Sequence, residues 1–152
     1  MDTARFRKGF GWGLIATIAM SVVMIAGMLT GLSPMPKPIP VAIVGKIVDG
    51  GLPQPALIAL GATAHLLYGG TFGGALAVVS FPVTVWKGVL VGLMLWLLMQ
   101  VVWLPFLGWG MFGVGLTPMI AGATLVLHLI YGAIIGWLID RRTYLPPHAL
   151  QS

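Results

Sequence analysis

Four long apolar stretches determine what this chain can fold into. They cover residues 10–32, 55–79, 85–107 and 117–139, and none contains an Asp, Glu or Arg. Each is long enough to cross a bilayer core of about 30 Å as an α-helix, which rises about 1.5 Å per residue. Charged residues make up only 7% of the chain, whereas a soluble domain carries about 25%. The sequence therefore predicts an all-α, four-helix transmembrane bundle, with residues 1–152 in a single membrane domain surrounded by the lipid bilayer.

The connection between the first two stretches differs from the later ones. Residues 34–40 alternate proline with other side chains, which favours an extended path. Residues 41–49 then have the pattern of a short amphipathic helix lying at the membrane interface. Residues 80–84 leave room only for a tight turn between the second and third helices.

Basic residues are divided unevenly between the two sides of the predicted bundle. The positive-inside rule places the more basic side in the cytoplasm. We therefore predict a multi-pass protein of the inner (cytoplasmic) membrane with both termini in the cytoplasm, and we interpret the charges as topology signals rather than a nucleic-acid-binding patch. The more basic side carries Arg5, Arg7, Lys8, Lys87, Arg141 and Arg142, and the other side carries Lys37 and Lys46.

The second and fourth stretches share a motif. Residues 65–73 read HLLYGGTFG and residues 128–136 read HLIYGAIIG, which gives the common pattern H-L-[LI]-Y-G-x-x-x-G. The first and third stretches share a weaker pattern, in which KG at 8–9 and GL at 13–14 correspond to KG at 87–88 and GL at 92–93. Because a two-helix unit returns to its starting side, we predict two parallel copies of a two-helix repeat, related by an axis along the membrane normal.

Small residues recur every four positions along the second and fourth stretches. This spacing places them on one helix face, where they let helix backbones approach closely in lipid. Because His65 and His128 continue the same faces, both histidines are predicted to lie inside the bundle rather than against lipid. The predicted helix-packing residues are Gly61, Gly69, Gly73, Gly132 and Gly136, with Thr124 in the place of a further glycine.

Polar side chains near the middle of each stretch predict a central polar layer with one member per helix. Polar residues inside a membrane favour a functional hypothesis, but a neutral histidine that hydrogen-bonds a neighbouring helix also serves packing alone. The members are Ser21, His65, Gln100 and His128, supported by Tyr68 and Tyr131 one turn from the histidines on nearly the same face.

The polar layer leaves several functions open. The leading hypothesis is a non-enzymatic accessory subunit that packs against partner membrane proteins, or against further copies of itself, in an electron-transfer or transport assembly. The first alternative is a haem b electron-transfer protein with His65 and His128 as axial ligands, since bis-histidine ligation needs two neutral imidazoles facing each other across the iron. The second alternative is a small homo-oligomeric channel or transporter in which histidine relays protons.

No catalytic site and no metal site are predicted. The four stretches contain no carboxylate, the chain has no cysteine, and no Ser-His-carboxylate set falls in one layer. Met20, Met24 and Met28 form a helical stripe of soft thioether groups, but such a stripe is more often packing than a copper site.

Two features of the sequence are similar to those of a known group of proteins. They are the repeated H-L-[LI]-Y-G motif and the proline-rich segment PMPKPIP at residues 34–40. In these features the chain resembles a group of small, uncharacterised prokaryotic four-helix membrane proteins. The resemblance covers most of the chain, and it implies the four-helix fold without implying an activity.

Overall fold

The structure, a computed structural model, describes residues 2–49 and 51–143, and side chains as far as position 140. This described part is helical and contains no strand. The long helices are α1 (Thr3–Leu29), α3 (Gln54–Val79), α4 (Val85–Leu98) and α6 (Met119–Thr143). Helix α4 continues through a π-helical turn, η1 (Met99–Trp103), into the single turn α5 (Leu104–Leu107). The connections contain α2 (Ile39–Ile47) and the short 3-10 turn η2 (Met111–Gly113).

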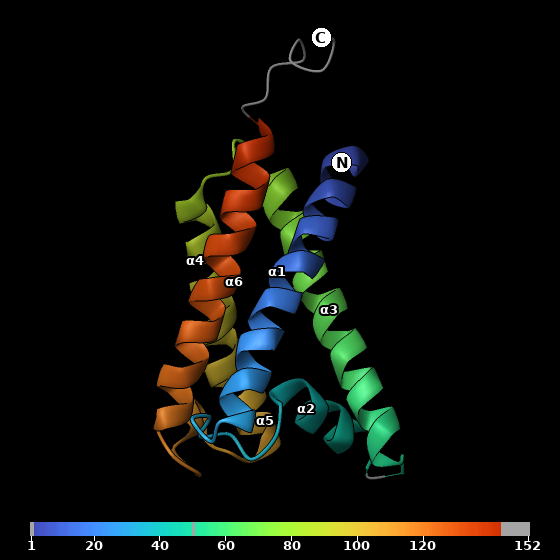
Figure 1. The fold of residues 1–152 in the computed structure, drawn as a ribbon, viewed down its shortest axis with the longest axis vertical. Helices are drawn as coiled ribbons and strands as arrows, with labels where there is room; N and C mark the ends of the chain where they lie inside the picture. Colours follow the sequence, from blue (N-terminus) through green and yellow to red (C-terminus); the bar gives the residue numbers. More distant parts are fainter. Residues whose placement is uncertain (1, 50, 144–152) are drawn as a thin grey trace.

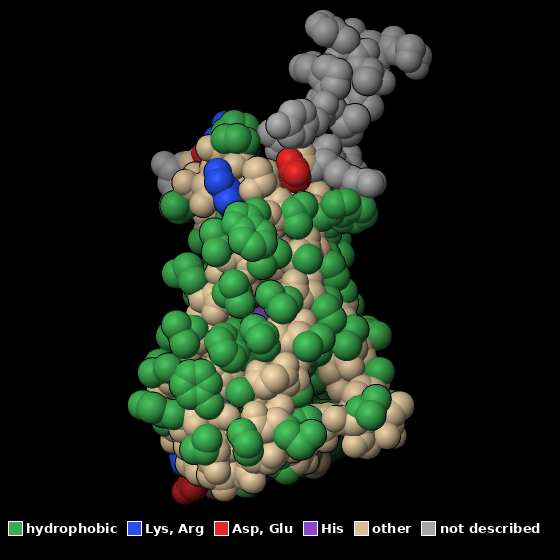
Figure 2. Space-filling view, turned by 90° about the vertical axis from the view of Figure 1, so that its left-hand side faces the viewer, with side chains coloured by type: hydrophobic (Ala, Val, Ile, Leu, Met, Phe, Trp, Pro, Cys, Tyr) green, Lys and Arg blue, Asp and Glu red, His purple; other side chains and the backbone are tan. Residues whose placement is uncertain are grey.

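Four segments are long and apolar enough to cross a membrane. They are α1, α3, the continuous segment Val85–Leu107 and the segment Met119–Asp140 of α6. Large apolar side chains point outward from them, among them Met94, which is 71% exposed. In Figure 2 apolar side chains cover the middle of the visible face, and charged side chains lie near its two ends. Because such a surface requires lipid around it, the chain is an all-α, multi-pass integral membrane protein, as predicted.

Helix α1 begins at Thr3, whereas hydropathy predicted a start at residue 10. The side chain of Asp2 accepts a hydrogen bond from the backbone N–H of Arg5 and forms an ion pair with the Arg5 side chain at 2.9 Å. An N-terminal cap of this kind satisfies a free N–H group and stabilises a polar first turn. The helix also ends earlier than predicted, at Leu29, and Gly31 follows with a φ of +74°.

The helices pair in two hairpins that contact each other. Helix α1 packs on α3, α4 packs on α6, and α1 also packs on α6. In Figure 1 the N-terminus and the end of α6 lie at the same end of the bundle. Toward the opposite end α1 and α3 diverge, and α2 lies between them there (Figure 1).

Glycines form the crossing between α1 and α3. A Cβ atom added to Gly13 would lie 2.5 Å from the carbonyl oxygen of Gly69, and one added to Gly73 would lie 2.6 Å from the carbonyl oxygen of Gly9. The two backbones therefore touch directly, which is the close approach predicted for small residues in lipid.

Helices α4 and α6 cross in the same way. A Cβ atom on Gly132 would lie 2.6 Å from the carbonyl oxygen of Gly88, and one on Gly136 would lie 2.7 Å from the Cα of Val85. A Cβ atom on Gly92 would collide with the carbonyl oxygen of His128. Four of the five predicted packing glycines thus lie at these two crossings.

The fifth predicted packing glycine, Gly61, contacts α2 instead of another long helix. A Cβ atom there would lie 2.9 Å from the Cα of Val41. On its other side α2 carries Lys46, whose Nζ lies 5.5 Å from the centre of the Phe106 ring. Contacts with α3 and α5 therefore hold α2 between the diverging helix ends.

Pro105 causes the π-helical turn η1. Proline lacks a backbone N–H, and its ring clashes with the carbonyl group four residues earlier, which disturbs a regular α-helix. The chain accommodates this with the wider turn Met99–Trp103, and π-turns inside α-helices are often found at functional sites. The turn also sets the directions in which Met99 and Trp103 point.

Candidate ligand cavity

A partly open cavity of about 300 Å³ lies between the helices of the bundle, and both predicted histidines line it. Its walls come from α1, α2, α3, α6 and the segment formed by α4 and η1. The lining residues are Thr17, Met20, Met24, Met35, Ile39, Pro40, Ile43, Val44, Ile47, Ala64, His65, Tyr68, Gly69, Leu95, Met99, Trp103, Thr124, Leu127, His128 and Tyr131.

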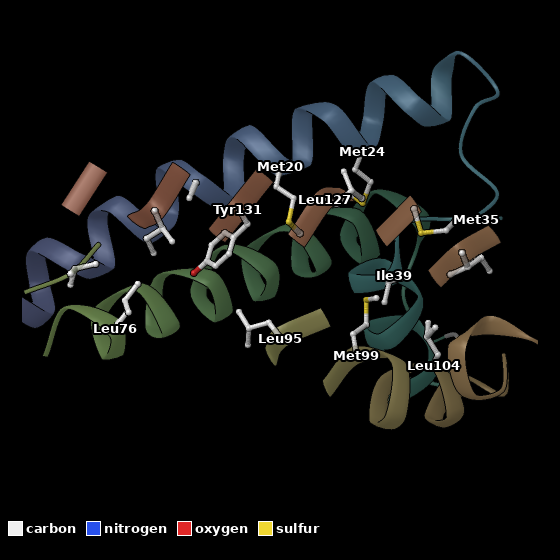
Figure 3. Close-up of a cluster of buried hydrophobic side chains, with 14 residues drawn as sticks. Met20, Met24, Met35, Ile39, Leu76, Leu95, Met99, Leu104, Leu127 and Tyr131 are labelled. Atoms are coloured by element: carbon white, nitrogen blue, oxygen red, sulfur yellow. The ribbon is translucent and has the colours of Figure 1, made fainter. Parts of the chain in front are cut away.

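The cavity wall is apolar and rich in methionine. No Asp, Glu, Lys or Arg lies among the described residues that line it. Met20, Met24, Met35 and Met99 are all buried, and Figure 3 shows their side chains directed into the space between α1, α2 and η1. Met28 of the predicted stripe is outside the lining, so the methionine cluster is assembled from three segments rather than from one helix face.

His65 is held by α1. Its Nδ1 atom lies 3.3 Å from the hydroxyl oxygen of Ser21, which is a hydrogen bond in which either group is able to donate. This contact joins two members of the predicted polar layer. It also leaves the second ring nitrogen, Nε2, for a partner in the cavity.

His128 is held by its own helix. Its Nδ1–H donates to the carbonyl oxygen of Thr124 at 2.8 Å. A carbonyl oxygen only accepts, so the proton is on Nδ1, and the neutral ring then keeps a lone pair on Nε2. No hydrogen bond to Nε2 of either histidine occurs within the described part of the chain.

Tyr131 links the two hairpins at the wall of the cavity. Its hydroxyl group donates to the carbonyl oxygen of Gly69 at 2.6 Å, and the side chain is buried. Tyr68 also lines the cavity, and its ring lies 4.8 Å from the ring of Phe72, measured between centroids. Both supporting tyrosines therefore lie at the same cavity as the histidines.

Gln100 does not line the cavity but lies directly behind it. Its Nε2 donates to the hydroxyl oxygen of Thr124 at 3.0 Å, and that hydroxyl in turn donates to the carbonyl oxygen of Ile120 at 2.6 Å. Gln100 is fully buried, and among the described residues its Oε1 atom has no hydrogen-bond partner.

The predicted polar layer is thus two separate groups. One joins Ser21 to His65, and the other joins Gln100 through Thr124 to His128. Thr124 was expected only as a small packing residue, although its place one turn before His128 was a usable signal. The contributions of Met35 and of α2 gave no comparable signal, because they depend on how the first connection folds back into the bundle.

Comparison with known proteins places the chain in a family without assigning an activity. Residues 3–150 match the sequence profile of a family of unknown function, DUF6789, and the chain belongs to this family. Searches of curated proteins and of solved structures gave no match.

Proposed function

We propose that this member of a family of unknown function is a non-enzymatic membrane component that binds one uncharged lipophilic ligand between His65 and His128. The observation that carries the proposal is the cavity itself, which has two imidazoles on its wall and an Nε2 atom of each left for a ligand. Pockets for small molecules are mostly apolar with a few polar groups that orient the ligand. This cavity has that composition.

A bis-histidine haem b protein is the second candidate. The Nδ1 contacts of both rings favour it, because a histidine ligand usually binds its metal through one nitrogen while the other is held by a hydrogen bond. The volume argues against it. Ligand pockets run from about 300 to 1,000 Å³, and this cavity is at the lower limit, so a porphyrin would have to push the helices apart.

The test is to isolate the protein from its native membrane into lipid nanodiscs and to identify the small molecules that come with it. We expect close to one non-phospholipid compound per chain in the organic extract. The double variant His65→Leu/His128→Leu should lose most of it, whereas Leu67→Ala/Val126→Ala, which changes outward-facing residues on the same helices, should retain it. An extract without such a compound, together with a visible spectrum without Soret and α bands, would contradict both candidates.

The accessory role is the second part of the proposal. It is supported by the apolar exterior and by connections too short to hold a separate catalytic domain. The assembly would be one of electron transfer or transport, with partner membrane proteins or further copies of the chain packed against the lipid-facing helices. Purification in a mild detergent as a stable monomer, without a stoichiometric partner, would contradict this part.

We also propose that both termini are cytoplasmic in the inner membrane, because the more basic end of the bundle carries them. The chain has no cysteine, so single-cysteine variants report topology without background. A membrane-impermeant maleimide should label Leu32→Cys in intact cells, and it should label Phe81→Cys only after permeabilisation. The reverse pattern would place the termini outside, and the cysteine-free parent is the control.

The two hairpins are proposed to be copies of one unit. Gly9 and Gly88 are equivalent in the weaker sequence pattern, and each lies at the crossing of its own hairpin. Gly73 and Gly136, which are equivalent in the stronger motif, lie opposite them. A duplication would explain why both crossings use glycine at matching positions.

A further inference from the structure

The hydrogen-bonding groups on the cavity wall are mostly acceptors. Three hydroxyl groups in the lining already donate to backbone carbonyl oxygens: Thr17 to Gly13 at 2.8 Å, Thr124 to Ile120, and Tyr131 to Gly69. Among the described lining residues, Tyr68 carries the one hydroxyl group that does not donate to a backbone carbonyl oxygen.

His128 adds a strong acceptor to this wall. Its Nδ1–H is occupied by the Thr124 carbonyl group, so the Nε2 lone pair requires a donor from the ligand. A buried acceptor without a partner is unfavourable. A ligand with a hydroxyl group therefore fits this site better than one that only accepts hydrogen bonds.

Size and charge limit the ligand further. The cavity of about 300 Å³ is roughly ten times the ~30 Å³ that a water molecule takes in the liquid, which is far more than a bare metal ion fills. No charged side chain among the described residues faces it, and a charged group in the bilayer interior is costly. The part of the ligand that the cavity encloses is therefore uncharged and about the size of one ring with short substituents. The cavity is partly open, so a longer apolar tail is able to extend out of it.

The methionines favour an aromatic ring. Thioether sulfur atoms make favourable contacts with the edges of aromatic rings, and flexible methionine side chains adapt to an irregular ligand. Four buried methionines and Trp103 line the same cavity as the histidines. They provide such contacts on several sides.

Resting on the proposed binding function, we infer that the ligand is a lipophilic quinol, held with one ring hydroxyl donating to Nε2 of His128, and that the site prefers the quinol over its quinone. The quinone has carbonyl oxygens where the quinol has hydroxyl groups, so it leaves the His128 acceptor without a partner. His65 is able to serve the other ring oxygen in either form, because the hydroxyl of Ser21 is able to donate or accept.

The experiment compares three probes on the ligand-stripped protein in phospholipid nanodiscs. They are a decyl-substituted benzoquinol, the corresponding quinone, and the dimethyl ether of the quinol, which keeps the ring and the tail but lacks the hydroxyl donors. Binding is measured by quenching of tryptophan fluorescence, since Trp103 lines the cavity. We expect the quinol to bind about tenfold more tightly than the quinone or the ether, because only the quinol is able to donate a hydrogen bond to Nε2 of His128.

The variant His128→Leu should remove this preference, and the outward-facing variant Val126→Ala should keep it. Because the comparisons with the quinone and with the ether both use the unaltered protein, together they decide the matter even if His128→Leu fails to fold. Equal affinity for all three probes would overturn the quinol inference and leave the binding function supported. Haem in the native extract, or tight binding of Cu(I) in place of the probes, would also overturn it. No binding of any probe, together with an empty native extract, would overturn both.

Discussion

Gly13→Ala and Gly88→Ala should each strongly destabilise the protein, although each adds only one methyl group. A Cβ atom at position 13 meets the carbonyl oxygen of Gly69 at 2.5 Å and the Cα of Gly70 at 2.9 Å, and one at position 88 meets the backbone of Gly132 and Gly136. Because backbone atoms have no rotamers with which to move aside, the helices must separate. Overpacking of this kind costs about 1–3 kcal/mol or more, and it will appear as a lower free energy of unfolding in a detergent titration.

Gly11→Ala and Gly122→Ala are the matched controls. A Cβ atom at either position has nothing within 4 Å, and alanine is intrinsically more favourable than glycine in a helix by up to about 1 kcal/mol. These two variants should be as stable as the parent protein or slightly more stable. If all four substitutions gave the same change, the crossings would not depend on direct backbone contact.

Thr124→Val and Gln100→Met should have opposite effects on the stability of the protein, although the two native side chains are hydrogen-bonded to each other. Valine has the shape of threonine but cannot accept the hydrogen bond from Nε2 of Gln100. The Gln100 amide, whose Oε1 atom already has no partner among the described residues, then has none there at Nε2 either. A buried polar group left in this state costs about 1–3 kcal/mol. Methionine at position 100 instead removes the whole amide, and the Thr124 hydroxyl keeps its bond to Ile120, so the stability should be unchanged or higher.

The double variant Thr124→Val/Gln100→Met completes the cycle. It should be more stable than Thr124→Val alone, because the amide that lacked partners is gone. This outcome is expected only if the Gln100 amide depends on the Thr124 hydroxyl group for its hydrogen bond. If Gln100→Met proved as damaging as Thr124→Val, the Oε1 atom would have a partner, such as a bound water, that stabilises the bundle.

The four spans were predictable because lipid acts on each segment separately. A run of apolar residues long enough to cross the bilayer must form a helix wherever its neighbours lie, and the helix around His65 was predicted on that basis alone. The start of α1 was missed because Asp2 and Arg5 make a local polar cap that hydropathy does not register. The glycine faces were predictable from spacing, but the position of Gly61 against α2 was not.

The cavity was predictable only in part. The motif placed His65 and His128 on packed faces, and both line one space. Which nitrogen of each histidine ring forms a hydrogen bond to a neighbouring group depends on how the helix is rotated about its axis. An error of one residue in the predicted helix phase turns a side chain by about 100°. Met99 reaches the cavity through the π-turn that Pro105 causes, and Met35 reaches it through a connection whose path depends on tertiary packing. Residues brought in by such irregular segments have no periodic pattern from which to predict them.

The position of the glycine crossings has a consequence for the surrounding lipid. The two helices of each hairpin touch backbone to backbone toward one end, while α2 lies between α1 and α3 at the other (Figure 1). The cross-section is therefore smaller in one leaflet than in the other. Acyl chains must spread around the narrow end and crowd around the broad end, so a curved bilayer with one compressed leaflet suits this shape better than a flat one.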